Sequence, residues 1–80
     1  MHKKRIIYRV RRERLYHPDI GHYTAYGIAA QRKYPLQTVE YISDVDVSRR
    51  RTRKIAALLN YYAIDPTETR YIIEDIFESP

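Results

Sequence analysis

The sequence predicts an α+β domain: a three-stranded antiparallel β-meander followed by an antiparallel two-helix hairpin packed on one sheet face. In the first half, apolar and polar residues alternate with the period of two that is typical of strands. In the second half, apolar residues recur every three to four positions, as they do on one face of a helix. Because 80 residues suffice for one core but not for two, residues 1–80 are expected to form a single domain.

The strands are expected at about 5–16, 22–32 and 37–43. The five residues at 17–21, between the first two strands, include proline, aspartate and glycine, each of which favours a turn. A turn of this length sets a register in which Val10 lies opposite Ile28 and Tyr8 lies opposite Ala30. The apolar sides of the two strands then share one face. The third strand is predicted from its β-favouring residues, and which of its sides faces inward stays open.

The helices are expected at about 46–62 and 66–78. The second helix has the clearest start signal in the chain. Asp65 is placed as its N-cap, Pro66 occupies the first helical position, and Glu68 is positioned to bond back to the cap. The first helix has three candidate N-caps, Asp44, Asp46 and Ser48.

The apolar helix faces and the strands supply the predicted core. On the first helix this face contains Val47, Ile55, Leu58, Leu59 and Tyr62. On the second helix it contains Ile72, Ile73, Ile76 and Phe77. The residues expected to be most buried are Ile28, Ile55, Leu59, Ile72 and Ile76. Among the tyrosines, those on apolar faces and therefore expected in the core are Tyr8, Tyr26 and Tyr62.

Three segments form a recognisable order of motifs: Tyr26-Gly27-Ile28, Asp44-Val45-Asp46, and the run from Asn60 through Ile64-Asp65-Pro66 to Ile73-Glu74-Asp75-Ile76-Phe77. This order resembles a small bacterial family of unknown function with a β-meander followed by a helical hairpin. The chain departs from the family pattern at Thr69, at Tyr71 and in the arginine cluster at 49–53. The resemblance implies the same fold and a bacterial cytoplasmic setting, but it supplies no catalytic or binding residues.

The composition argues against several classes of protein. The chain has no cysteine, which excludes disulfides, thiolate metal sites and thiol catalysis. Its first residues are charged, unlike a signal peptide, and no apolar run approaches the ~18 residues of a membrane span. The apolar helix faces are needed for the core, which argues against an amphipathic membrane anchor. We therefore expect a cytoplasmic protein without membrane contact.

The net charge of +5 is unevenly distributed. Residues 1–14 contain seven Lys or Arg, residues 49–54 contain five, and residues 65–80 contain five acids. Cations in the first turns of a helix oppose its dipole, so we expect acids of the second helix to compensate those at 49–54. In an antiparallel hairpin of the two helices, the residues expected to lie side by side and to pair are Arg50 with Glu78, Arg53 with Asp75, and Lys54 with Glu74. The alternative is that these cations are free to bind a partner.

The sequence gives little support for a metal site or for an enzyme active site. His17, Asp19 and His22 surround the first turn and could coordinate zinc, but an ordinary polar turn has the same composition. We predict neither a metal site nor a cofactor. No serine, histidine and acid arrangement stands out, and no carboxylate lies in an apolar setting that would raise its pKa. A small enzyme or metal-binding protein is therefore the distant alternative.

The uneven charge favours an anionic partner. The predicted register places Arg9 beside Ala29 and Arg11 beside Gly27, where small neighbours leave both guanidinium groups accessible. The predicted binding residues are Lys3, Lys4, Arg5, Arg9 and Arg11. The chain is interpreted as a small non-catalytic binding or regulatory module with a basic surface for an acidic partner, possible partners being an acidic protein or a nucleic acid. Nucleic acid contacted through its backbone is the alternative, although the acidic second helix disfavours helix-turn-helix docking. Self-association is a third possibility.

Overall fold

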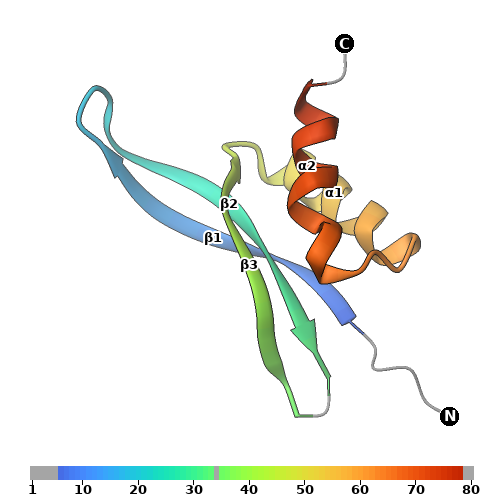
Figure 1. The fold of residues 1–80 in the computed structure, drawn as a ribbon. Helices are drawn as coiled ribbons and strands as arrows, with labels where there is room; N and C mark the ends of the chain where they lie inside the picture. Colours follow the sequence, from blue (N-terminus) through green and yellow to red (C-terminus); the bar gives the residue numbers. More distant parts are fainter. Residues whose placement is uncertain (1–5, 34, 79–80) are drawn as a thin grey trace, which may run out of the picture.

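A computed structural model describes residues 6–33 and 35–78, and it confirms the predicted α+β class. The elements are β1 (Ile6–His17), β2 (Gly21–Arg32), β3 (Gln37–Asp46), α1 (Arg49–Tyr61) and α2 (Pro66–Glu78). The strands form an antiparallel sheet in the order β1-β2-β3, and the two helices pack against it (Figure 1). Strand β3 is longer than the predicted 37–43, and α1 begins later than predicted.

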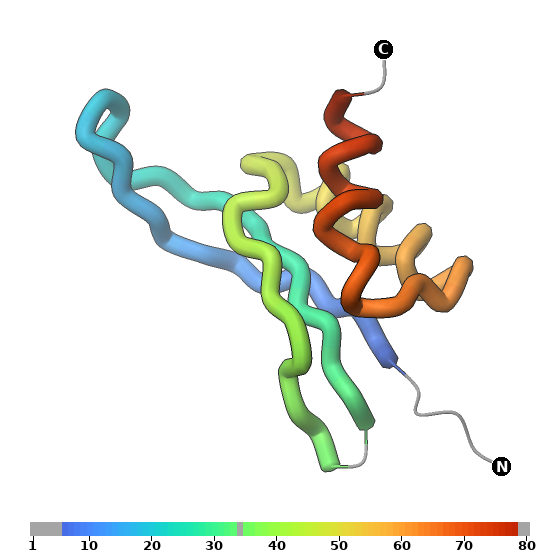
Figure 2. Tube along the Cα trace, viewed as in Figure 1, coloured from blue at the N-terminus to red at the C-terminus, as the bar shows by residue number. Residues whose placement is uncertain are grey.

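The molecule is elongated, with extents of 50 × 32 × 20 Å. The helices lie beside the central part of the sheet, while the far end of the β1–β2 hairpin projects away from them (Figure 2). The turn at that end uses Gly21 with a φ of +78°, a left-handed conformation that suits glycine. The strands therefore extend well beyond the part of the sheet that the helices cover.

The predicted register of the first hairpin is confirmed. Tyr8 pairs with Ala30 and Val10 with Ile28, as the turn length indicated. These residues lie on the face that packs against the helices. The buried cluster there consists of Tyr8, Ile28, Ala30, Ile42, Ile55, Ala56, Leu59 and Ile73. Because Ile42 belongs to this cluster, the side of β3 that contains Ile42 faces the helices. The sequence had left the orientation of this strand open.

The predicted core is right in part for each helix. Ile28, Ile55, Leu59 and Ile73 are buried as expected. On α2, however, Ile72 is half-buried and Ile76 is 37% exposed, and Thr69 is buried although it was not predicted to be. The other predicted face residues that are exposed are Val47, Leu58, Tyr62 and Phe77.

The reason for this difference is the placement of α2. Helix α2 packs mainly on β3, whereas α1 packs mainly on β1 and β2. In Figure 1, α2 crosses in front of α1 and does not run back along its length. A helix that contacts one strand buries only a narrow stripe, here the i, i+4 pair Thr69 and Ile73, and its remaining apolar residues stay near solvent.

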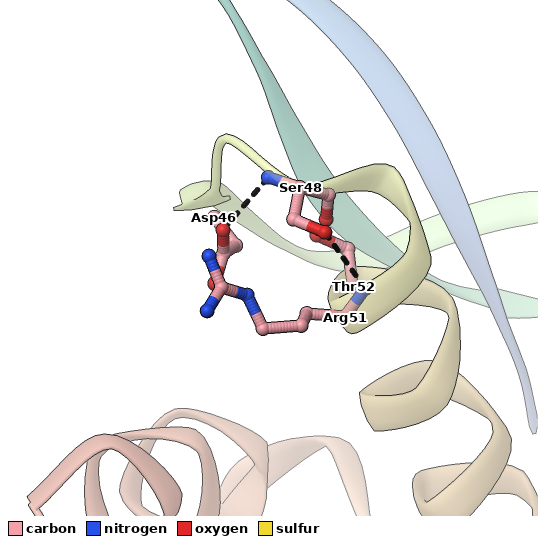
Figure 3. Close-up of polar contacts among 4 residues, drawn as sticks. All are labelled: Asp46, Ser48, Arg51 and Thr52. Carbon is pink, nitrogen blue, oxygen red and sulfur yellow. Dashed lines mark hydrogen bonds and ion pairs between the residues drawn. The ribbon is translucent and has the colours of Figure 1, made fainter.

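Ser48 caps α1, so Asp44 and Asp46 do not. The Ser48 side chain accepts a hydrogen bond from the Arg51 backbone N–H at 3.2 Å. Asp46 accepts one from the Ser48 N–H at 2.7 Å and pairs with the Arg51 guanidinium at 3.2 Å, while the Thr52 hydroxyl donates to the Ser48 carbonyl (Figure 3). These bonds satisfy the free N–H groups of Ser48 and Arg51 at the helix start, which favours a helix that begins at Arg49.

Asp65 caps α2 as predicted. Its carboxylate accepts hydrogen bonds from both the backbone N–H and the hydroxyl of Thr67, at 2.9 and 2.8 Å. These bonds lower the pKa of Asp65. The expected return bond from Glu68 to the cap is not formed among the described residues. The Thr67 hydroxyl is the side-chain group that bonds to the cap instead.

The sheet face away from the helices is crossed by long side chains from the outer strands. Strand β2 has small residues there, and a Cβ at Gly27 would collide with the hydroxyl of Tyr41 from β3. From β1, Glu13 accepts hydrogen bonds from the Asp44 N–H and the Ser43 hydroxyl of β3, each at 2.8 Å. Burial and a hydrogen bond to Glu13 raise the pKa of Tyr41 to about 12. Glu13 thus links β1 to β3 across β2.

Replacing Leu59 by alanine tests the packing of α1. Leu59 is 1% exposed, so the change leaves a cavity and should lower the free energy of unfolding by about 2–5 kcal/mol. The neighbouring Leu58 is 48% exposed, and Leu58→Ala should cost less than about 1 kcal/mol. Urea denaturation measures both. Equal losses for the two variants would contradict the orientation of α1.

The Glu13 link predicts a pH dependence of stability. Burial raises the pKa of Glu13, but the hydrogen bonds from Asp44, Tyr41 and Ser43 outweigh burial and lower it below 4.5. A lowered pKa in the folded state stabilises the fold above the unfolded pKa, and this contribution is lost as the pH falls through the folded pKa. Glu13→Gln should therefore be less stable than the parent at pH 6, with a smaller difference at about pH 3.

Urea denaturation at the two pH values measures this difference. Glu68→Gln, on the exposed surface of α2, is the control for loss of one negative charge. A constant gap between Glu13→Gln and the parent at both pH values would show that the Glu13 carboxylate does not stabilise the sheet.

Candidate functional site

A groove with a volume of about 710 Å³ lies between the outer edge of β1 and helix α1. Four arginines line it, Arg9 and Arg12 from β1 and Arg49 and Arg53 from α1. The other lining residues are Tyr8, Val10, Tyr26, Ala56, Ala57 and Asn60. We call this site the arginine groove. Its cations come from two segments far apart in the sequence, which makes it the main candidate for binding an anion.

The local structure explains why these side chains meet. Strand β1 is at an edge of the sheet, so its outer side has no neighbouring strand. On α1, Arg49 and Arg53 are four residues apart and therefore lie one above the other on the same helix face. Ala56 and Ala57 follow on the same side and present only methyl groups. The side of α1 that lines the groove thus has charged side chains in its first turns and small side chains further along. The small side chains leave space for a ligand.

Asn60, at the end of α1, closes one end of the groove. Its side-chain oxygen accepts a hydrogen bond from the Tyr8 backbone N–H at 2.7 Å, and its side-chain nitrogen donates to the Tyr8 carbonyl at 3.0 Å. The amide thus bonds to both backbone groups of one residue on an edge strand, as a neighbouring strand would. These two bonds fix the distance between α1 and β1.

The Tyr8 side chain makes a second connection, to the start of α2. Its hydroxyl donates to the Ile64 carbonyl at 2.6 Å and lies 2.9 Å from the Thr69 hydroxyl. Because a phenol has a single proton, donation to Ile64 leaves the Tyr8 oxygen as an acceptor, and the Thr69 hydroxyl can donate either to that oxygen or to the Asp65 carbonyl at 3.3 Å. Burial raises the pKa of Tyr8. The buried Thr69 hydroxyl thus connects Tyr8 with the start of α2.

The cations at 49–54 are not paired with the acids of α2. Within residues 6–33 and 35–78, Arg51 pairs with Asp46, and no other Lys or Arg side chain pairs with a carboxylate. The expected pairs of Arg50 with Glu78, Arg53 with Asp75 and Lys54 with Glu74 are therefore wrong, because α2 packs on β3 and does not run back along α1. The alternative, that these cations are free to bind, applies to all of them except Arg51.

A second hollow of about 470 Å³ extends the basic surface around α1. It is lined by Arg49, Arg50, Arg53, Lys54 and Ala57. Arg49, Arg53 and Ala57 also line the arginine groove, so the two hollows adjoin. A partner longer than the groove would thus continue onto a positively charged helix face.

The structure separates the residues that the sequence grouped as a binding site. Arg9 lines the arginine groove. Arg11 is exposed but is not among the groove residues, and it lies near Tyr41, where its charge offsets part of the rise in the Tyr41 pKa that burial and Glu13 cause. Lys3, Lys4 and Arg5 lie outside the described residues. Sequence reasoning missed Arg12, and it left open whether Arg49 and Arg53 are paired with acids or free to bind. The four-residue spacing of these two arginines, which precedes Ala56-Ala57 and Asn60, is the signal that could have favoured binding.

The polar residues around the first turn form no metal centre in the part of the chain that the structure describes. The His17 ring nitrogen accepts a hydrogen bond from the Asp19 N–H at 3.1 Å, a local turn contact, and His22 packs against the Tyr16 ring. Among the described residues, neither helix is long and apolar enough to cross a membrane.

Comparison of the chain with protein-family models, with curated proteins and with solved structures gave no match. The resemblance to a small bacterial family therefore stays a prediction from the order of motifs. The function has to be inferred from the arginine groove itself.

Tyr8→Phe tests the contacts that connect the groove to α2. The variant leaves the Ile64 carbonyl without this partner and removes one of the two contacts of the Thr69 hydroxyl, which keeps the Asp65 carbonyl. It should lower the free energy of unfolding by roughly 1–3 kcal/mol. Tyr16→Phe, at a residue that is 63% exposed, is the matched control and should change stability by less than about 0.5 kcal/mol. Thermal denaturation measures both. A Tyr8→Phe variant as stable as the control would contradict the hydrogen-bond network.

Proposed function

We propose that this protein is a non-catalytic binding module whose arginine groove binds an acidic segment of a partner protein. One observation supports the proposal most directly. Four arginines line the groove, two from β1 and two from α1, and none of them pairs with a carboxylate among the described residues. Such an arrangement leaves charge that a partner's carboxylates would neutralise. The cytoplasmic setting implied by the family resemblance belongs to the same proposal.

The chemistry of arginine fits carboxylate ligands. A guanidinium group can donate two parallel hydrogen bonds to one carboxylate, and these charge-assisted bonds are shorter and stronger than neutral ones. A groove with walls formed by a strand and a helix also excludes part of the solvent, which strengthens electrostatic attraction compared with a flat surface. The groove thus favours short, closely spaced acidic side chains.

Nucleic acid is the second candidate, and the specific observation in its favour is Tyr26. This half-buried tyrosine lines the groove beside the arginines, and a base of a single strand could stack on it. We favour the acidic protein because the groove is short and partly walled, whereas nucleic-acid binding usually follows a long, continuous phosphate backbone.

The double variant Arg12→Ala/Arg53→Ala tests the proposal by removing one cation from each wall. Its affinity for a fluorescein-labelled peptide of alternating glutamate and valine should fall by about tenfold, because several charge-assisted hydrogen bonds are lost from a partly exposed site. Fluorescence anisotropy measures the affinity. Both side chains are exposed, so stability should change little.

The control is Lys33→Ala/Arg70→Ala, which lowers the net charge equally at two exposed residues away from the groove. It should bind the peptide nearly as well as the parent. Equal losses in the two double variants would show that only net charge matters and would contradict the groove as the site. Tighter binding of an oligothymidylate than of the peptide, with a logarithmic salt slope near ~0.7 per phosphate, would favour the nucleic-acid alternative.

A further inference from the structure

The outer edge of β1 offers unpaired backbone groups inside the arginine groove. Successive residues of a strand direct their N–H and C=O groups to opposite sides. The bonds from Asn60 show that the backbone of Tyr8 faces outward. Strand β1 pairs with β2 without a register shift, so the backbones of Val10 and Arg12 face the same way. Among the described residues, no side chain or loop bonds to either of them.

The groove lies against this part of the edge. Val10 and Arg12 both line it, with Ala56 and Ala57 of α1 on the other side. A new strand needs to lie about 4.8 Å from its neighbour, and the small alanines leave room for one. Asn60 already occupies the edge at Tyr8, so an added strand would begin beyond that residue and extend towards Arg12.

We propose that the acidic partner segment binds in an extended conformation as a fourth strand, paired with the Val10–Arg12 edge of β1. This inference rests on the proposed function and adds the binding mode to it. The backbone bonds would supply affinity, and the arginines on both walls would select acidic side chains at alternate positions, as in other cases of strand addition. The alternation of side chains on the added strand directs every second residue towards α1.

Charge favours this occupant over a second copy of the chain. Pairing β1 with β1 of another molecule would bring together two strands that each contain Arg9, Arg11, Arg12 and Arg14. Like charges on neighbouring strands destabilise their pairing. An acidic segment meets the same arginines with the opposite charge. The edge is therefore open to an acidic strand and protected against its own copy.

Amide hydrogen exchange and a proline variant test this mode on the full chain. Binding of the glutamate–valine peptide should slow exchange of the Val10 and Arg12 amide protons by about tenfold or more, since both become hydrogen-bonded. Val10→Pro removes one outward N–H, keeps every arginine and is compatible with an edge strand. It should weaken peptide binding by about tenfold. Tyr16→Pro removes an outward N–H outside the groove and should bind like the parent.

The outcomes separate the two proposals. Peptide binding that depends on Arg12 and Arg53, but leaves exchange at Val10 and Arg12 unchanged, would overturn strand addition and leave the proposed function standing. Binding that is independent of both arginines would overturn both. Slow exchange at Val10 without peptide, together with a dimer in sedimentation, would make a second copy the occupant. The same peptide N-methylated at every amide keeps its carboxylates, and undiminished affinity for it would also overturn strand addition.

Discussion

The two hydrogen bonds between the Asn60 side chain and the Tyr8 backbone determine how the helices sit on the sheet. They attach the end of α1 to the edge of β1, while the Tyr8 hydroxyl bonds to Ile64 and Thr69 at the start of α2. One tyrosine therefore connects the sheet edge and both helices. Because α1 is attached at this edge, its arginines face those of β1. The arginine groove is thus a direct consequence of the contact that positions the helix.

The other sheet face stabilises the same edge strand from behind. Since Gly27 has no side chain, Tyr41 can lie across β2, and Glu13 reaches the bulged end of β3 near Asp44, which adopts a left-handed φ of 54°. Strand β1 is then bonded to β2 through its inner backbone groups and to β3 through Glu13. An edge strand fixed in this way changes little on binding, which reduces the entropic cost of adding a further strand.

The sequence predicts the sheet better than the helix packing, for physical reasons. The period of two and the length of the turn are local features, and together they determine the pairing of Tyr8 with Ala30. The crossing of α2 depends on tertiary contacts that have no periodic signal, such as the buried hydroxyl of Thr69 against Tyr8. For the same reason the sequence identified Arg9 but not Arg12 or Arg53, whose proximity depends on the Asn60 bonds across 52 positions of the chain.

An edge strand has unpaired backbone groups that can pair with an unrelated chain, and the charges of β1 restrict such pairing. The outward backbone of β1 beyond Tyr8 would bond to any extended segment, but the arginines around it make that pairing depend on charge. Tyr8 is already bonded to Asn60, which limits the length of the free edge. On the helix side, Ala56 and Ala57 place only methyl groups opposite this part of the edge. The proposed fourth strand would therefore be selected by the arginines around it, and this dependence on charge distinguishes a binding edge from an aggregation-prone one.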